Sequence, residues 1–226
     1  MKNIKMIGMS VVLVCSIILV NWNFIPAQAD ANLVFYLPTD EGSGLLPATS
    51  TQTSTFGEVD YAKITVLMDN NGNGSLKSGH GLSILVETHN LTILLDSGLS
   101  DLLLKQNVED LGKNLSLVDF AVISHEHFDH IDGMPYFAEV NPNATVYVPA
   151  GMASAAKTTL INLNLSVVDI AASTILSPGV AIIGQLNGPP MEQALTINIS
   201  KIGQVILVGC SHPGVENIVS KAINDF

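Results

Sequence analysis

Three histidines and one aspartate occur within the six residues His125-Glu126-His127-Phe128-Asp129-His130. Zinc binds imidazole nitrogen at about 2.0–2.1 Å and carboxylate oxygen at about the same distance, so these are the donor types of a metal site. His125 and His127 are two residues apart in an extended loop, so both side chains point the same way. Asp129 and His130 follow the bend and would face a second ion, about 3.5–4 Å from the first. Because the whole chain has six histidines, this density favours a metal centre over a polar turn.

Two apolar runs are expected to position the candidate ligands. Residues 117–123 predict a buried strand that ends at Ser124, directly before the histidines. Residues 205–208 predict a second buried strand, followed by Gly209-Cys210-Ser211-His212. His212 is therefore expected to be a metal ligand, and the alternative is a cap of the helix after Pro213. Cys210 is a further candidate ligand, and its alternative is a small buried hydrophobic residue.

Asp96 follows a third predicted strand at 91–95, and Ser97-Gly98 turns the chain after it. A carboxylate there would hydrogen-bond or bind a metal, so Asp96 is also a candidate ligand. The alternative is an N-cap for a helix that begins near Ser100 or Asp101.

The remaining periodicity predicts short strands flanked by helices, which indicates an α/β fold with layered sheets and outer helices. The other expected strands cover 62–68, 82–87, 144–148, 165–170, 180–183 and 195–199. The expected helices cover 99–106, 132–138, 150–159 and 215–223.

A loop at 69–74 resembles the start of a calcium loop, but His80 occupies the position of its last glutamate, so a plain loop is favoured.

His-x-His-x-Asp-His after an apolar strand resembles the signature of the metallo-β-lactamase superfamily. Four other stretches are similar to its branch of dihydropterin ribofuranosylaminobenzene phosphate synthases: Thr65-Val66-Leu67-Met68-Asp69-Asn70, His80-Gly81-Leu82-Ser83, Leu94-Leu95-Asp96-Ser97-Gly98 and Gly209-Cys210-Ser211-His212-Pro213-Gly214. The resemblance runs from about Tyr61 to the C-terminus. It implies a four-layer αββα sandwich over residues 59–226, incomplete at its C-terminal edge.

The resemblance also implies a reaction. One or two zinc ions, or other divalent metals, would be held by His125, His127, Asp129, His130 and His212. Water activated by these ions would attack an ester, amide or phosphoester of a small-molecule substrate. Asp129 would be catalytic, either by steadying the nucleophile or by protonating the leaving group.

Two alternatives remain open beside this hydrolase. One is a transferase similar to the synthases of the resembled branch, and the other is an exported metal-binding module without catalysis. The superfamily pattern supplies one more histidine after the last helix, whereas this chain ends at Phe226 without it. We therefore expect either a fragment or a shortened second half of the fold.

Composition excludes one class of partner. The chain of 226 residues has a net charge of −11 and contains no arginine. It has no stripe of basic residues, so we expect no binding to nucleic acid. Its length and its 47% apolar content suit one globular domain. Nothing in the sequence indicates an oligomeric state.

The N-terminal residues 1–29 have the pattern of a secretory signal peptide. Lys2 and Lys5 precede an apolar run at 7–20, and Ala27-Gln28-Ala29 supplies a cleavage site. The run is shorter than a membrane span requires, so no stable span is expected after cleavage. Residues 30–58, rich in Ser, Thr, Gly and Pro, are expected to form a flexible linker. The expected location is therefore secreted or periplasmic, where Cys210 would have no intramolecular disulfide partner.

We predict that the exported protein begins at Asp30. Cleavage after Ala29 would remove both lysines of the signal and leave 20 acidic residues against 7 lysines. Mass analysis of the N-terminus of protein recovered outside the cytoplasm checks this, and an intact Met1 there would contradict it.

Overall fold

The computed structural model describes residues 56–226 except Asn73 and Ser75. The expected signal peptide at 1–29 and the expected linker as far as residue 55 lie outside this part. Phe56 is buried, and its ring stacks on that of Phe226 with 4.6 Å between centroids. The packed part of the chain therefore includes the last residues assigned to the linker. None of the described helices is long and apolar enough to cross a membrane.

A six-stranded sheet carries most of the residues expected at the site. Its strands lie side by side in chain order: β1 (Ala62–Met68), β2 (Ser83–Thr88), β3 (Thr92–Leu95), β4 (Phe120–Val122), β5 (Thr145–Pro149) and β6 (Ser166–Ile170). The first three are antiparallel, and β3 to β6 are parallel. The strand predicted at 117–123 is shorter than expected. Residues Leu115–Leu117 form a 3-10 turn instead, because the side chain of Asn114 accepts the N–H of Ser116.

A second, antiparallel sheet has the strand order β10-β9-β8-β7. Its strands are β7 (Thr174–Ser177), β8 (Val180–Asn187), β9 (Met191–Ile199) and β10 (Gly203–Leu207). Strand β7 was not predicted, and β9 begins four residues before the predicted start at Leu195. The added part of β9 contains two polar residues, Glu192 and Gln193, and both are buried.

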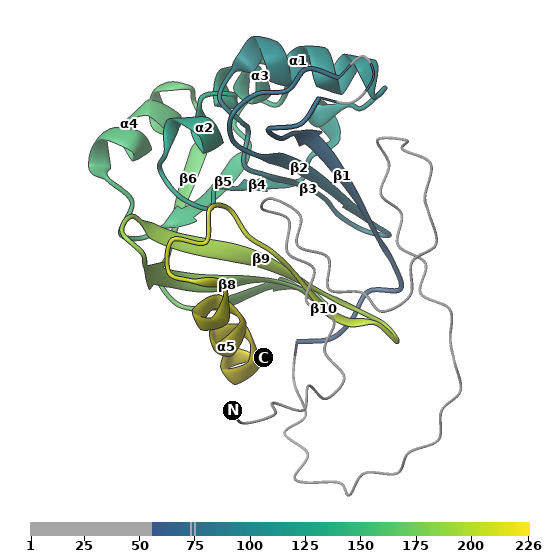
Figure 1. The fold of residues 1–226 in the computed structure, drawn as a ribbon, viewed down its shortest axis with the longest axis vertical. Helices are drawn as coiled ribbons and strands as arrows, with labels where there is room; N and C mark the ends of the chain where they lie inside the picture. The colour runs from purple at the N-terminus through teal and green to yellow at the C-terminus, as the bar shows by residue number, and fades with distance from the viewer. Residues whose placement is uncertain (1–55, 73, 75) are drawn as a thin grey trace, which may run out of the picture.

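Helices cover the outer faces of both sheets (Figure 1). Around the first sheet the helices are α1 (Asp101–Asp110), α2 (Phe128–Ile131), α3 (Met134–Val140) and α4 (Ser154–Asn162), and α5 (Val215–Asp225) covers the second. One buried apolar cluster joins the first sheet to helices such as α1 and α3 and includes Leu94, Leu104 and Phe137. A second lies between the sheets and includes Ile93 and Leu195. A third lies under α5. The expected αββα sandwich is therefore confirmed.

Gln193 ties the two sheets together directly below the histidine motif. Its side-chain Nε2 donates to the carbonyl of Ile123 at 2.9 Å and to that of Tyr147 at 3.0 Å. Its backbone N–H donates to the carbonyl of Ser124 at 3.0 Å. One residue of β9 therefore bonds both to β5 and to the segment after β4. The histidine motif begins in that second segment.

We predict that Gln193→Ala lowers the free energy of unfolding by about 1–3 kcal/mol, because the carbonyls of Ile123 and Tyr147 lose the hydrogen bonds from its side chain. Chemical denaturation measures the change. The control is Gln106→Ala on the exposed face of α1, which should stay within about 0.5 kcal/mol of the parent chain. Equal losses in both variants would contradict a specific role for the link between the sheets.

Candidate metal centre

The candidate ligands come together at one edge of the sandwich, where several strands end. Asp96 follows β3, His125 follows β4, and Cys210 and His212 follow β10. His80 lies in the loop between β1 and β2. The carboxyl ends of parallel β3 and β4 point the same way, so their loops share this edge. The second sheet brings the end of β10 to it.

Three imidazoles form a nearly equilateral group. The ring centroids of His125 and His127 are 4.7 Å apart, and each ring lies 4.8 Å from the ring of His212. The three rings stand edge to face, with interplanar angles of 74–84°. One nitrogen from each lies within 4.8 Å of the others. Three histidines around one point are a known ligand set of catalytic zinc.

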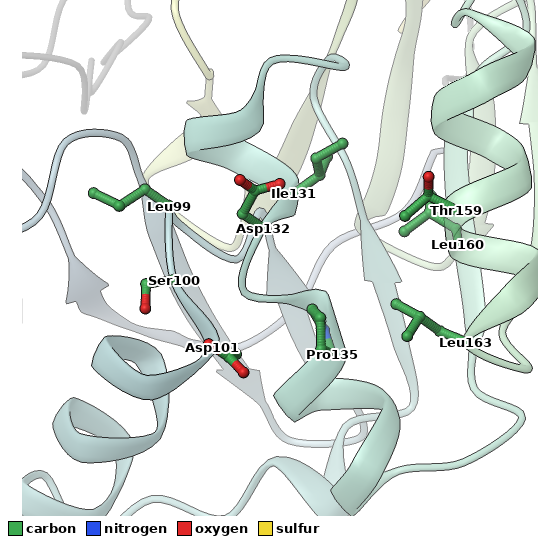
Figure 2. A pocket seen from close by; sticks show the side chains of 9 residues that line it. All are labelled: Leu99, Ser100, Asp101, Ile131, Asp132, Pro135, Thr159, Leu160 and Leu163. Carbon is green, nitrogen blue, oxygen red and sulfur yellow. The ribbon is translucent and has the colours of Figure 1, made fainter.

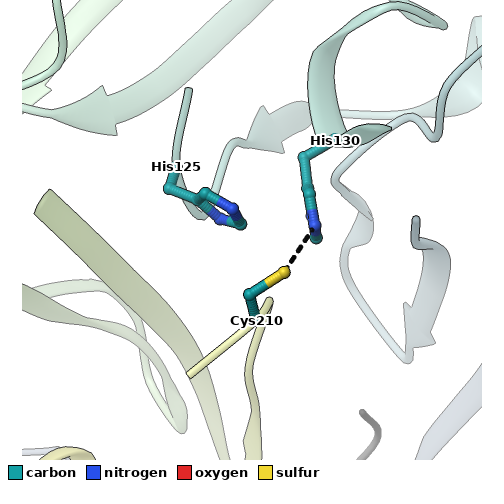
Figure 3. Close-up of side chains that lie close together, drawn as sticks. All are labelled: His125, His130 and Cys210. Atoms are coloured by element: carbon teal, nitrogen blue, oxygen red, sulfur yellow. Dashed lines mark hydrogen bonds between the residues drawn. The ribbon is translucent and has the colours of Figure 1, made fainter. Parts of the chain in front are cut away.

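A second group of donors contains His125, His130 and Cys210 (Figure 3). The Nε2 atom of His130 lies 3.2 Å from the sulfur of Cys210. The two groups share His125, whose Nδ1 lies 2.9 Å from the hydroxyl of Ser124 and whose Nε2 faces His127. His125 therefore has one nitrogen available and cannot serve two ions separately.

Burial and crowding lower the pKa of two of these imidazoles and favour their neutral form. Burial, together with the neighbouring His130, His127 and His212, lowers the pKa of His125 to about 2. Burial and the nearby His127 and His130 also lower the pKa of His212. For His130, burial lowers the pKa, but the charge and hydrogen bond of Asp96 outweigh this and raise it overall. Neutral imidazole is the form that binds a metal.

Asp96 lies behind the histidines. Its side chain is fully buried, and one oxygen accepts the backbone N–H of Ser124 at 2.6 Å. The other oxygen accepts the Ser124 hydroxyl at 2.6 Å and lies 2.7 Å from Nδ1 of His130. Asp96 is thus placed to orient His130 with Nε2 facing Cys210, and such carboxylate–histidine pairs fix the tautomer of ligand histidines. The N-cap alternative is wrong, because Ser100 caps α1.

Asp129 belongs to neither group of three donors. Its Oδ2 atom lies 3.5 Å from Nε2 of His130 and 3.3 Å from Nε2 of His80. Only 7% of its side chain is exposed, whereas His80 is 68% exposed. The carboxylate is therefore bracketed by two imidazoles, one buried and one open to solvent.

Glu192 is a site residue that the sequence analysis missed. It is 1% exposed in β9, and its two oxygens accept the backbone N–H groups of Ser211 at 2.9 Å and of His212 at 2.7 Å. Burial raises its pKa, while those two hydrogen bonds act in the opposite direction. Glu192 therefore holds the loop that presents Cys210 and His212. No sequence motif identifies Glu192, because it has the pattern of an ordinary polar residue at the start of a strand.

The loop after β10 approaches the loop after β4 closely. A Cβ atom on Gly209 would overlap the hydroxyl of Ser124. A residue without a side chain is therefore required where the ligand segments of the two sheets meet.

These residues fit a metal ion. Among the described residues, no partner hydrogen-bonds to Nε2 of His212, although this atom is buried. Such a buried imidazole nitrogen normally has a partner. Because His212 lies beside the imidazoles of His125 and His127, a cation is the partner that suits its lone pair. His212 also does not cap α5, whose N-cap is Gly214.

A hollow of about 370 Å³ lies between the start of α1, the segment joining α2 to α3, and α4 (Figure 2). It is lined by Leu99, Ser100, Asp101, Ile131, Asp132, Pro135, Thr159, Leu160 and Leu163. None of the candidate metal ligands lines it, so we do not assign it to the reaction.

Comparisons with known proteins match the part of the chain that carries these residues. Residues 92–188 match the family described as "Beta-lactamase superfamily domain", a range that includes Asp96 and the histidine motif. The chain is 26% identical to the 7,8-dihydropterin-6-methyl-4-(beta-D-ribofuranosyl)-aminobenzene-5'-phosphate synthase of Methanocaldococcus jannaschii, over 74% of each chain. The resemblance expected from the motifs is therefore confirmed.

Solved structures of the same fold class also match. One is an N-acyl homoserine lactone hydrolase, with a TM-score of 0.48, 20% identity, and coverage of 67% of this chain and 75% of the other. Another is the metallo-beta-lactamase fold protein YhfI of Bacillus subtilis, with a TM-score of 0.49 and 15% identity. That match covers 64% of this chain and 60% of the other.

We predict that Glu192→Gln weakens metal binding about 10–100-fold, as is usual when a group that supports a ligand is changed. The amide keeps the size of the side chain but turns an NH₂ group toward a backbone N–H of the ligand loop. Zinc titration of the metal-free protein measures the affinity. Glu139→Gln on α3, where the side chain is exposed, is the control. Unchanged affinity in Glu192→Gln would contradict the positioning role.

Proposed function

We propose that this chain, whose residues 92–188 match the beta-lactamase superfamily domain, is a metal-dependent hydrolase. The observation that carries the proposal is the close group of His125, His127 and His212, in which Nε2 of His212 is buried without a hydrogen-bond partner among the described residues. Three imidazoles leave a coordination position open, as catalytic zinc sites do.

His125, His127 and His212 would hold one divalent ion, with zinc as the leading candidate. A second ion, where bound, would use His130, Asp129 and Cys210, because the one available nitrogen of His125 is already assigned. Such an ion supplies Lewis-acid polarisation of the scissile bond and lowers the pKa of water.

Asp129 is proposed to act as the general base and then as the general acid. Its Oδ2 would accept a proton from the water that attacks the carbonyl carbon. As the bond from that carbon to the leaving group breaks, the same atom would return the proton to the leaving oxygen or nitrogen. Asp96 and Glu192 act indirectly, since they hold His130 and the loop of His212 in place.

The charge around the site favours an uncharged acyl substrate over a phosphorylated one. The chain has no arginine, and arginine is the usual residue for bidentate phosphate recognition. Three acidic side chains, Asp96, Asp129 and Glu192, are buried at the site. Phe128, which is 59% exposed beside His80, adds an apolar surface at the edge. We therefore propose esters, lactones or amides with an apolar group.

A synthase-like transfer is the second candidate, supported by the 26% identity to the Methanocaldococcus jannaschii synthase. The name of that protein includes a 5'-phosphate, and a phosphate would need a cationic partner. Among the described residues, no lysine hydrogen-bonds or forms an ion pair with the histidine cluster or Asp129. This observation ranks the transferase below the hydrolase.

Turnover on a substrate panel tests the proposal. Zinc-loaded and chelator-treated protein should be assayed with esters, lactones, β-lactams and phosphodiesters. We expect hydrolysis of an acyl class that is lost on chelation and restored by zinc. Asp129→Asn should lower the rate by about 10²–10⁴-fold, and Asp110→Asn, exposed at the end of α1, should not change it. Bound metal without turnover on any class would instead support a non-catalytic metal-binding module.

A further inference from the structure

We propose that His80, in the loop between β1 and β2, is an additional ligand of the metal centre on the side of Asp129. This inference rests on the proposed function, because it requires that the centre binds metal. It extends the ligand set to a segment that precedes the histidine motif by more than forty residues.

The spacing of the donors supports a shared ion. Two donors that bind one ion at about 2.0–2.1 Å with tetrahedral angles lie about 3.3–3.4 Å apart. Nε2 of His80 is 3.3 Å from Oδ2 of Asp129, and that oxygen is 3.5 Å from Nε2 of His130. His130 is in turn 3.2 Å from the sulfur of Cys210. The two pairs that involve Asp129 are therefore spaced about as ligands of one ion are, and the closer contact of His130 with Cys210 continues the row of donors.

The loop backbone holds His80 against α2. The N–H of Leu82 donates to the carbonyl of Asp129 at 3.3 Å, and the N–H of Gly81 donates to the side chain of Asn70 at 3.0 Å. Gly81 has a φ of 101°, and a Cβ there would overlap the carbonyl of Asp129. The positions of His80 and Asp129 along the two segments are thus fixed relative to each other.

The side chain of His80 is nevertheless open to solvent. It is 68% exposed, and its ring lies 6.4 Å from the ring of Phe128. In the structure it reaches Asp129 and is not part of either group of three donors. Metal binding would therefore draw the imidazole toward His130 and Cys210 by side-chain rotation, without movement of the loop backbone.

An ordinary surface ion pair is the competing explanation. A pair between a solvent-exposed histidine and a carboxylate contributes little to stability and would not affect a metal. The chain supplies a matched control, because His89, the remaining histidine, is exposed in the turn between β2 and β3. If His80 merely pairs with Asp129, its replacement should leave metal binding as unchanged as the replacement of His89.

Titration with cobalt(II) chloride tests the proposal on the full chain after metal removal. Imidazole, thiolate and carboxylate groups bind cobalt(II), and its visible absorption changes with coordination. We expect the parent chain to take up two equivalents. In His80→Ala the second equivalent should bind more weakly. Loss of a group that only supports a ligand costs about 10–100-fold in affinity, and loss of a ligand should cost more than that. The absorption of the second equivalent should also change, while the affinity for the first equivalent and the melting temperature of the metal-free protein stay the same.

His80→Asn, which keeps a polar side chain without the imidazole, should behave as His80→Ala does, and His89→Ala should match the parent chain. The proposal is overturned if His80→Ala binds both equivalents with the affinity and spectrum of the parent chain. It is also overturned if the parent chain binds only one equivalent, although the proposed function then stands. Failure to bind any equivalent would overturn the proposed function itself.

Discussion

The buried carboxylate of Asp96 is the constraint on which the geometry of the site depends. It lies at the end of β3, with no exposed surface, and bonds to the backbone and hydroxyl of Ser124 at the end of β4. The same carboxylate contacts Nδ1 of His130. A buried charge is costly unless it is fully hydrogen-bonded, so Asp96 brings these three groups together. Because His125 is the next residue after Ser124, these hydrogen bonds also fix the position of its backbone.

The second sheet supplies a matching constraint from the other side. Glu192 binds two backbone N–H groups of the loop that carries His212, and Gln193 bonds to the carbonyls of Ile123 and Tyr147. Two adjacent residues of β9 therefore fix both the ligand loop and the distance between the sheets. The histidine cluster lies where these two sets of hydrogen bonds meet, and packing alone would not align it so closely.

The sequence predicted the parts of the site that local patterns encode. The histidine motif after a strand, and Cys210 and His212 after another, could be found because metal ligands cluster at strand ends. The sandwich followed from the resemblance, and the strand at 62–68 matches β1. The ligand assignments themselves stay predictions, although the structure brings all of these side chains together.

The missed parts depend on contacts between distant residues. Glu192 is recognised only by its hydrogen bonds to residues 19 and 20 positions away. His80 was read as the end of a loop, and its contact with Asp129 spans 49 positions in the chain. The length of β9 was underestimated because Glu192 and Gln193 interrupt the apolar pattern, although both are buried. Asp96 was assigned two roles, and only the fold separates them, since Ser100 caps the helix.

The central claim is that the histidine cluster is a metal site coupled to the stability of the fold. The most direct test compares the melting temperature and the metal content of the parent chain and of His127→Ala, with and without a chelator. A ligand at one hundred times its dissociation constant stabilises the folded state by about 2.7 kcal/mol, or about 5–10 °C for a domain of this size. We expect the parent chain to lose its metal and that stabilisation on chelation, and His127→Ala to hold less metal and to have less of that stabilisation from the start. A parent chain without metal, whose melting temperature does not respond to zinc or to the chelator, would contradict the account.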